Sequence, residues 1–322
     1  MSLLKRMTAA ACLMLLPALA VSADPVVAKH IAKDAKWYIH LDFAAAKQTV
    51  LYSSVLDAVR AHFPLDDTLA QIKQFLDVDP LTDISGATVY NTSFEKDVAA
   101  IILYAKVNPE RFAQVLGQNP DFGQKTYNNH ALLSWTDNND GKHKNGCFYA
   151  PGVVLMADRE ETLKMAVDVM DGAKPAESPL AKRPEAAGAF LYASADLAQA
   201  PDQNVSQLLS NSEAATACLG ETEGKLKLSV NITAKSPQTG AQLKKLLDGV
   251  KAFGELAASR DMPTAAALLQ QVELTADGTH LSASFSHDSK TLLQTIQKLD
   301  AEHKAKAAHQ PAAAEGEKPQ GL

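Results

Sequence analysis

Apolar and polar residues alternate along several short segments of the chain, and each segment predicts a β-strand. The clearest spans 225–233, where Leu, Val and Ile on one face alternate with Lys, Ser, Asn and Thr on the other. A strand with one wet face is typical of an antiparallel sheet. Further strands are expected at 37–42, 86–92, 98–107, 131–135, 147–157 and 189–195, and in a hairpin that turns at Asp277-Gly278.

Other segments repeat their apolar residues every three or four positions, which predicts amphipathic helices. The longest carries Leu243, Leu246, Leu247, Val250 and Phe253 on one stripe. Aspartates that precede such segments are expected to act as N-caps, because their carboxylates accept hydrogen bonds from the first backbone N–H groups. The remaining helices are expected at 44–62, 66–76, 109–116, 159–170 and 205–219 and after Asp288, with Asp42, Asp66, Asp158 and Asp288 as caps.

Together these elements predict an α+β fold of two similar lobes, each an antiparallel sheet covered by helices on one face. The length of 322 residues leaves room for about two domains. A proline-rich segment separates the lobes, and the last residues, rich in Ala, Lys, Glu and Pro, predict a disordered tail. The expected boundaries are 24–172 for the first lobe, 173–186 for the linker, 187–303 for the second lobe and 304–322 for the tail.

The two lobes begin alike, which predicts an internal duplication. At 38–43 and again at 191–197, an alternating strand closes on an aspartate and an apolar residue. Each half then continues with paired strands and helices and finishes on a helix.

The layout resembles a family of exported bacterial proteins that is known only as a domain of unknown function. The resemblance rests on short motifs, which are Leu41-Asp42-Phe43, Val78-Asp79-Pro80, Val153 to Ala157 with Asp158, and Asp196-Leu197. It covers most of the chain after residue 23 and implies a duplicated strand–helix module. That family has no established active site, so the resemblance implies no catalytic, cofactor or metal residue.

The N-terminus carries the pattern of a bacterial signal peptide, which is expected to span 1–23. Lys5 and Arg6 precede an apolar run at 7–20, and small residues follow, so cleavage is expected after Ala23. The run is too short for a stable transmembrane helix. The mature protein is therefore expected in the periplasm or outside the cell, without a transmembrane segment.

The net negative charge of the chain restricts which kinds of partner we expect. The full chain carries a formal net charge of −6, and loss of Lys5 and Arg6 with the signal peptide leaves −8. Nucleic acid requires a basic surface, and anionic lipid attracts basic proteins. We therefore expect no nucleic-acid partner and no electrostatic binding to anionic lipid.

Two cysteines remain after cleavage, Cys147 and Cys218. In an oxidising compartment they can form one disulfide between the two halves of the chain, or they can stay as separate buried thiols. The sequence leaves both alternatives open.

Few residues have the spacing that a reactive site needs. His40 and Asp42 share one face of an expected strand, but Asp42 is better explained as an N-cap. The segment 137–141 (DNNDG) is rich in oxygen ligands, but its glycine is misplaced for a calcium loop and no helix flanks it, so a hairpin turn is the better interpretation. Asp77 and Asp79 belong to a turn that ends in proline.

The histidines lack the paired spacing of a metal enzyme, and the chain has no nucleophile-elbow or P-loop motif. We therefore expect no catalytic residue, no metal and no cofactor. The histidines considered, besides His40, are His143, His280, His287, His303 and His309.

Three functions compete. The first is a non-catalytic envelope protein that binds a partner or has a structural role, favoured by wet sheet faces and the lack of convergent reactive groups. The second is a periplasmic carrier of an apolar ligand held between sheet and helices, and the third is a hydrolase with a site assembled from scattered residues. A deep apolar cavity would favour the carrier, and a cleft that gathers His40, Asp42 and another charged group would favour the enzyme.

Overall fold

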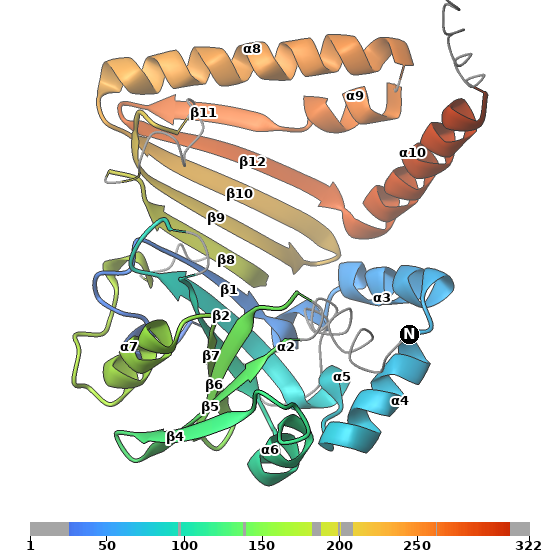
Figure 1. Cartoon of the computed structure of the whole chain (residues 1–322). Helices are drawn as coiled ribbons and strands as arrows, with labels where there is room; N and C mark the ends of the chain where they lie inside the picture. The colour runs from blue at the N-terminus through green and yellow to red at the C-terminus, as the bar shows by residue number, and fades with distance from the viewer. Residues whose placement is uncertain are drawn as a thin grey trace, which may run out of the picture.

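A single antiparallel sheet organises the protein in the computed structural model, which describes residues 26–95, 98–137, 140–181, 188–198, 200, 209–261 and 263–309. The expected signal peptide lies outside these residues. The described strands follow the order β11-β12-β10-β9-β8-β1-β2-β3-β7-β6-β5-β4 (Figure 1). The expected α+β class with antiparallel strands is therefore confirmed.

Helices and strands alternate irregularly along the chain. The strands are β1 (Trp37–Asp42), β2 (Ile84–Asn91), β3 (Ala100–Ala105), β4 (Gly123–Tyr127), β5 (His130–Thr136), β6 (His143–Ala150), β7 (Val153–Ala157), β8 (Ala189–Asp196), β9 (Ser212–Thr222), β10 (Lys225–Ala234), β11 (Glu273–Asp277) and β12 (His280–Asp288). The helices are η1 (Ala28–His30), α2 (Phe43–Ala46), α3 (Val50–His62), α4 (Leu65–Leu76), α5 (Pro80–Asp83), α6 (Pro109–Leu116), α7 (Glu160–Met170), η2 (Pro179–Ala181), α8 (Pro237–Asp261), α9 (Pro263–Gln270) and α10 (Ser289–His309).

The two halves of the chain meet in the middle of the sheet. Strand β1 pairs antiparallel with β8, and His40 lies opposite Tyr192. From this junction the first half continues in the order β2-β3-β7-β6 and the second half in the order β9-β10-β12-β11. One continuous sheet therefore serves both halves, where a separate sheet for each was expected.

The register places one side chain of every strand in a single row across the sheet. Paired residues of antiparallel strands point to the same face, so the row defines one face, called here the His40 face; the opposite one is the Leu41 face. From β11 to β4 the row reads Glu273, Ser284, Ser229, Cys218, Tyr192, His40, Thr88, Ile102, Leu155, Cys147, Leu132 and Lys125. It is apolar through β3, β7, β6 and β5 and polar at its β11 end.

Helix α7 covers the His40 face in the first half. Its Leu163 and Val167 are fully buried and belong to the same core cluster as Ile102 and Leu155. The burial of large aliphatic side chains in one cluster supplies most of the stabilisation of such a core.

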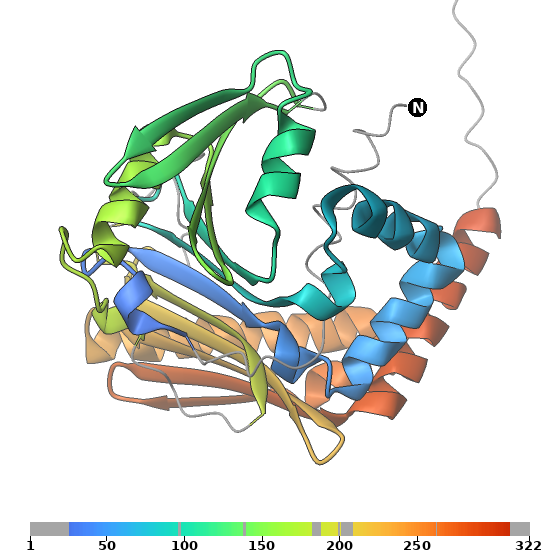
Figure 2. The ribbon, with the colours of Figure 1, turned by 90° about the horizontal axis from the view of Figure 1, so that it is seen from below.

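The Leu41 face carries the other packed helices. Phe43 of α2 lies in one cluster with Ala87 and Leu103, and in the second half Leu243 of α8 and Leu292 of α10 join separate clusters on this face. Seen from below, α8 and α10 flank the strands of the second half (Figure 2). The first half therefore has helices on both faces of the sheet, whereas helices on one face were expected.

Strand β9 occupies 212–219 of the helix that was expected at 205–219, and 205–208 lie outside the described residues. The strand pairs with β8 on one side and β10 on the other. Gly220 lies inside β9, and a Cβ on it would come within 2.6 Å of the Cα of Ala189. The helix prediction is wrong because pairing on both edges outweighs the local propensity.

The segment expected as one strand at 147–157 is a hairpin. Strands β6 and β7 turn at Pro151-Gly152, where Gly152 has a φ of 82° that favours glycine. Asn145 and Gly146 lie inside β6.

Two of the expected N-caps are confirmed. The N–H of Ala45 donates to Oδ1 of Asp42, and the N–H of Thr291 donates to Oδ1 of Asp288, both at 2.8 Å. The cap of α7 was predicted wrongly, because this helix begins after Arg159 rather than after Asp158.

Two further boundaries differ from expectation. Helix α4 begins at Leu65, so Asp66 lies in its first turn and is not the cap. Helix α10 continues to His309, past residue 304 where the tail was expected to begin. The tail residues 310–322 lie outside the described residues.

Candidate functional site

Helix α8 presents two different apolar surfaces. Leu243 is buried and Leu247 is half-buried against Ile232 and Leu281 of the sheet. A second set points away from this contact and is exposed, with Leu246 at 51%, Val250 at 60%, Phe253 at 73% and Leu256 at 72%. We call these four residues the α8 ridge. Their spacing of three to four residues aligns them along one side of the helix.

The sequence predicted one apolar stripe that ends at Phe253, and the structure divides it into a buried and an exposed set. The helix lies along the outer margin of the molecule, beyond β11, so one side faces the sheet and the other faces outward (Figure 1). Among the residues that the structure describes, no helix is long and apolar enough to cross a membrane. The ridge is thus a surface feature of a packed helix.

Two acidic side chains beside the ridge, Asp248 and Glu255, are paired within α8. Lys244 Nζ lies 2.7 Å from Asp248 Oδ2, and Lys251 Nζ lies 3.4 Å from Glu255 Oε1. Lys245, directly before Leu246, is exposed. Lys245 therefore adds a positive charge near the ridge, and the carboxylates of Asp248 and Glu255 already have partners.

A second feature is a hollow of about 580 Å³ on the His40 face of the second half. Its wall is built from strands β9 to β12 and carries serine hydroxyls and two opposite charges. The lining residues are Cys218, Gly220, Lys227, Leu228, Ser229, Gln271, Glu273, Ser284, Phe285 and Ser286. Polar groups therefore lie among apolar surface in this hollow, a combination that can orient a bound ligand.

The His40 and Asp42 pair is not aimed at a cleft. The His40 side chain is fully buried, and its Nδ1 lies 2.8 Å from Thr88 Oγ1, between the rings of Tyr104 and Tyr192. The carboxylate of Asp42 accepts the capping hydrogen bond of α2. The structure therefore separates the roles of the two residues, and the structural interpretation of Asp42 is confirmed.

The same side of the sheet holds a second histidine. His30 of η1 has its Nδ1 3.1 Å from the hydroxyl of Tyr104. Burial lowers the pKa of His30 to about 4, with a smaller effect of the neighbouring Lys29 charge, and burial raises the pKa of Tyr104 to about 12. At neutral pH this pair is uncharged and links η1 to β3.

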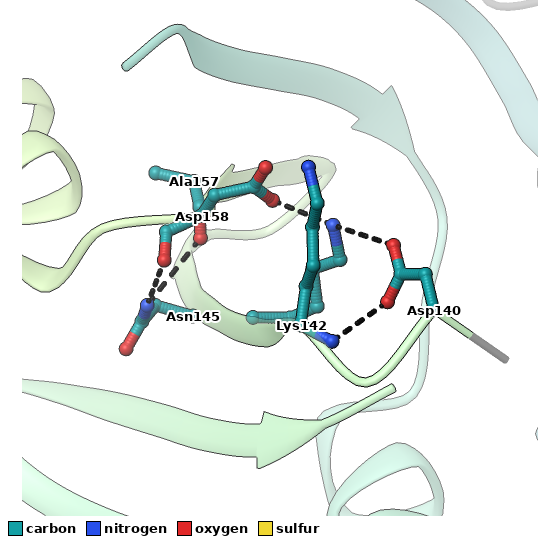
Figure 3. A network of polar contacts seen from close by, with 6 residues as sticks. Asp140, Lys142, Asn145, Ala157 and Asp158 are labelled. Carbon is teal, nitrogen blue, oxygen red and sulfur yellow. Dashed lines mark hydrogen bonds and ion pairs between the residues drawn. The ribbon is translucent and has the colours of Figure 1, made fainter. Parts of the chain in front are cut away.

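The loop considered as a calcium site is held by lysines instead. Oδ1 of Asp140 accepts the backbone N–H of Lys142 at 2.9 Å, which lowers the pKa of Asp140, and Oδ2 lies 3.7 Å from Lys144 Nζ (Figure 3). Lys144 also donates to Asp158 Oδ1 at 2.7 Å. Asn145 Nδ2 adds hydrogen bonds to the carbonyl oxygens of Ala157 and Asp158. Two carboxylates sharing one ammonium group fasten the loop to β7.

No metal centre forms in the part of the chain that the structure describes, since no three His, Cys, Asp or Glu residues are placed to share an ion. Asp79 caps α5 by accepting the N–H of Leu81 at 3.1 Å and pairs with Lys73, while Asp77 ends α4 in a left-handed conformation. His280 and His287 lie at opposite ends of β12. Asp77 and Asp79 therefore have structural roles.

Cys147 and Cys218 are buried thiols that do not form a disulfide with each other. They lie on β6 and β9, with β7, β3, β2, β1 and β8 between them in the sheet. A disulfide requires Cα atoms within about 7 Å, and five intervening strands prevent this approach along the sheet. Of the two alternatives, the structure contains the separate thiols. Burial raises the pKa of the Cys147 thiol to about 11, which disfavours the nucleophilic thiolate.

One polar cluster has no signal in the sequence. Asp168 accepts hydrogen bonds from Tyr127 and Asn128, and Asp171 accepts from Tyr149 at 2.9 Å and lies 3.1 Å from His130 Nε2. These contacts tie the C-terminal end of α7 to β4, β5 and β6. Their partners are about 20 to 40 residues apart in the chain, so local patterns could not have found them.

Lys47, at the C-terminal end of α2, is a buried lysine whose effect on stability can be tested by substitution. Its Nζ is buried without a hydrogen-bond partner among the described residues, and burial lowers its pKa to about 8, partly offset by the charge of Asp79. The charged form is therefore disfavoured in the fold, and this cost is present below pH 8 and relieved as the pH rises. Lys47→Met should raise the free energy of unfolding at neutral pH by about 1 kcal/mol, after allowance for solvent screening.

Urea titration at neutral pH would measure this difference. Lys106→Met, which replaces an exposed lysine, is the matched control and should change stability by less than about 0.5 kcal/mol. A loss of stability in Lys47→Met would contradict the burial of an unpaired ammonium group.

Comparison with known proteins gives a distant structural likeness. Neither a family model nor a curated protein sequence matches the chain. Among solved structures, crystal form I of TP0453 is 10% identical with a TM-score of 0.42 and covers 87% of this chain and 99% of its own. Crystal form IV of TP0453 is 12% identical with a TM-score of 0.43 and covers 85% and 96%. At these values the chain is similar to TP0453 over most of its length, and no function follows from the likeness.

Proposed function

We propose that this is an exported, non-catalytic binding protein that docks to another protein of the cell envelope through the α8 ridge. The observation that carries the proposal is the exposure of Leu246, Val250, Phe253 and Leu256 in one line on a helix that is already packed on its other side. Contiguous exposed apolar surface rimmed by polar residues is a usual mark of a protein interaction site.

The spacing and charge of the ridge define the partner. Anchors at intervals of three and four residues match the way an amphipathic helix fits an apolar groove. Lys245 is exposed beside the ridge, and Asp248 and Glu255 are paired inside the helix. The complementary surface is therefore an apolar groove with a carboxylate at its rim.

The wider setting is part of the same proposal. Export to the periplasm or beyond is supported by the signal-peptide pattern of residues 1–23. An internal duplication with two lobes, as in the family of unknown function that the sequence resembles, is supported by the corresponding strand orders on either side of the β1–β8 junction. The absence of catalysis is supported by the structural roles of His40, Asp42 and Asp140.

Photo-crosslinking in the native envelope tests the proposal. A photoreactive phenylalanine analogue would replace Val250, Phe253 or Leu256 in the full-length protein. Ala241, exposed on another side of the same helix, would be the control position and should give no adduct, whereas Gln242 extends the line of the ridge. We expect the three ridge positions to give adducts with one and the same protein, mapped by mass spectrometry to an apolar groove. Adducts with lipid, with a second copy or with nothing would overturn it.

A substitution measures the contribution of the ridge. Phe253→Ala should weaken binding to the identified partner by about 2 kcal/mol, roughly 30-fold, as for a central aromatic anchor. Because the side chain is exposed, protein stability should change by less than about 0.5 kcal/mol. Calorimetry of the purified pair gives the affinity, and Thr275→Ala, an exposed substitution on β11, should leave the affinity unchanged.

A further inference from the structure

The hollow on the His40 face has a floor of hydroxyl groups. Ser284 pairs with both Ser229 and Glu273, and Lys227 pairs with Ser286, so these five side chains point to one face from three neighbouring strands. Among the described residues, the three serine hydroxyls make no hydrogen bond, which leaves donors and acceptors directed at the hollow.

A lysine and a glutamate, which carry opposite charges, lie at two corners of this hollow. Lys227 lies on β10 and Glu273 on β11, with β12 between them. Their Cβ atoms are offset by two strand spacings across the sheet and by two residues along the strands. This offset corresponds to a distance of about 12 Å. Neither side chain forms an ion pair within the described part of the chain. The two charges are therefore available to a molecule that spans the floor.

Glycine borders the hollow on its third side. Gly220 pairs with Lys227, and a Cβ on it would lie 2.6 Å from the Cα of Ala189. A glycine at this position lets the two backbones approach closely. On β9, the position paired with Lys227 therefore has no side chain that would fill the hollow.

We propose that this hollow binds a short peptide of two to three residues with free termini, independently of the α8 ridge. The terminal carboxylate contacts Lys227, the terminal ammonium group contacts Glu273, and the serine hydroxyls bind the peptide amides. An extended chain advances about 3.3 to 3.6 Å per residue, so a tripeptide has a length comparable to the separation of the two Cβ atoms. The volume of about 580 Å³ lies in the range of small-molecule sites.

Trialanine with free termini is the probe for this site. We expect saturable binding by calorimetry and chemical-shift changes confined to β9, β10, β11 and β12 in NMR spectra of the mature protein. Acetylation of the probe's amino terminus or amidation of its carboxyl terminus should each weaken binding about tenfold, the usual effect of losing one charge-assisted hydrogen bond. Equal binding of blocked and free peptides, or no saturable shift, would overturn the proposal.

Two variants assign the contacts. Lys227→Met should weaken binding of free trialanine about tenfold and abolish the preference for a free carboxylate, and Glu273→Gln should do the same for the free amine. Lys225→Met, two residues away on the same strand and outside the hollow, should bind like the wild type. If Lys225→Met weakened trialanine binding as much as Lys227→Met, the loss would come from the change in net charge and not from a contact with Lys227. That result would refute the assignment. Phe253→Ala should leave peptide binding unchanged, which separates this site from the partner surface.

Discussion

Replacing Leu155 with alanine should lower the free energy of unfolding by about 4 kcal/mol. Leu155 is fully buried on β7 and lies in the row between Ile102 and Cys147, under Leu163 and Val167 of α7. The residue is enclosed by strands on both sides and a helix above, so the structure cannot collapse into the space left by the missing methyl groups. The cost therefore includes both lost burial and a cavity.

The same substitution at an exposed leucine is the matched control. Leu246→Ala removes an identical group from the α8 ridge, where half of the side chain is exposed, and should change stability by less than about 0.5 kcal/mol. Urea unfolding followed by far-ultraviolet circular dichroism and by tryptophan fluorescence would measure both variants. Similar losses in the two variants would contradict the burial pattern described for β7 and α8.

The shape of the unfolding curve tests the sheet itself. Because β1 and β8 join the halves in one sheet, Leu155→Ala in the first half should shift a single transition seen by both probes. Two separate transitions, with only one shifted by Leu155→Ala, would indicate that the halves fold independently.

The prediction of the fold from sequence succeeded where periodicity and packing agree. At 225–233, alternation predicted a strand with one wet face, and β10 has this character, with Leu226 and Ile232 buried and Lys227 exposed. At 205–219 a helix was expected, and for the described residues 212–219 only the pairing of β9 with β8 and β10 reveals a strand. Such pairing depends on distant segments, which a local pattern does not contain.

The α8 ridge and the hollow on the His40 face could not be predicted from the sequence, for a related reason. The apolar stripe of α8 was predicted correctly as apolar, but sequence cannot say that only Leu243 and Leu247 of this stripe would meet the sheet. Likewise, Lys227 and Glu273 are 46 positions apart and become neighbours only through the pairing of β12 with both β10 and β11. Both features arise from the order of strands rather than from any local motif.

Acidification should destabilise the protein through His30 more than through exposed histidines. The pKa of His30 is lowered from 6.5 to about 4 in the fold, mainly by burial. Between these values the unfolded chain binds the proton more tightly than the fold, so stability is fully present above pH 6.5 and falls as the pH approaches 4. Protonation also places a positive charge on the partly buried ring, whose Nδ1 lies 3.1 Å from the hydroxyl of Tyr104.

The expected loss from His30 is about 2 kcal/mol between neutral pH and about pH 4, once solvent screening of this partly exposed ring is included. His30→Gln keeps a hydrogen-bonding side chain but cannot titrate, so its stability should fall less steeply than that of the wild type over this interval. His62→Gln, at an exposed histidine, is the matched control and should follow the wild-type curve. Urea unfolding at several pH values would give the free energy of unfolding of the three proteins as a function of pH. If the curves of wild type and His30→Gln were parallel, η1 would not hold a neutral histidine against β3. The result matters for the architecture because His30 and Tyr104 connect the segment before β1 to the middle of the first half, on the same face as α7.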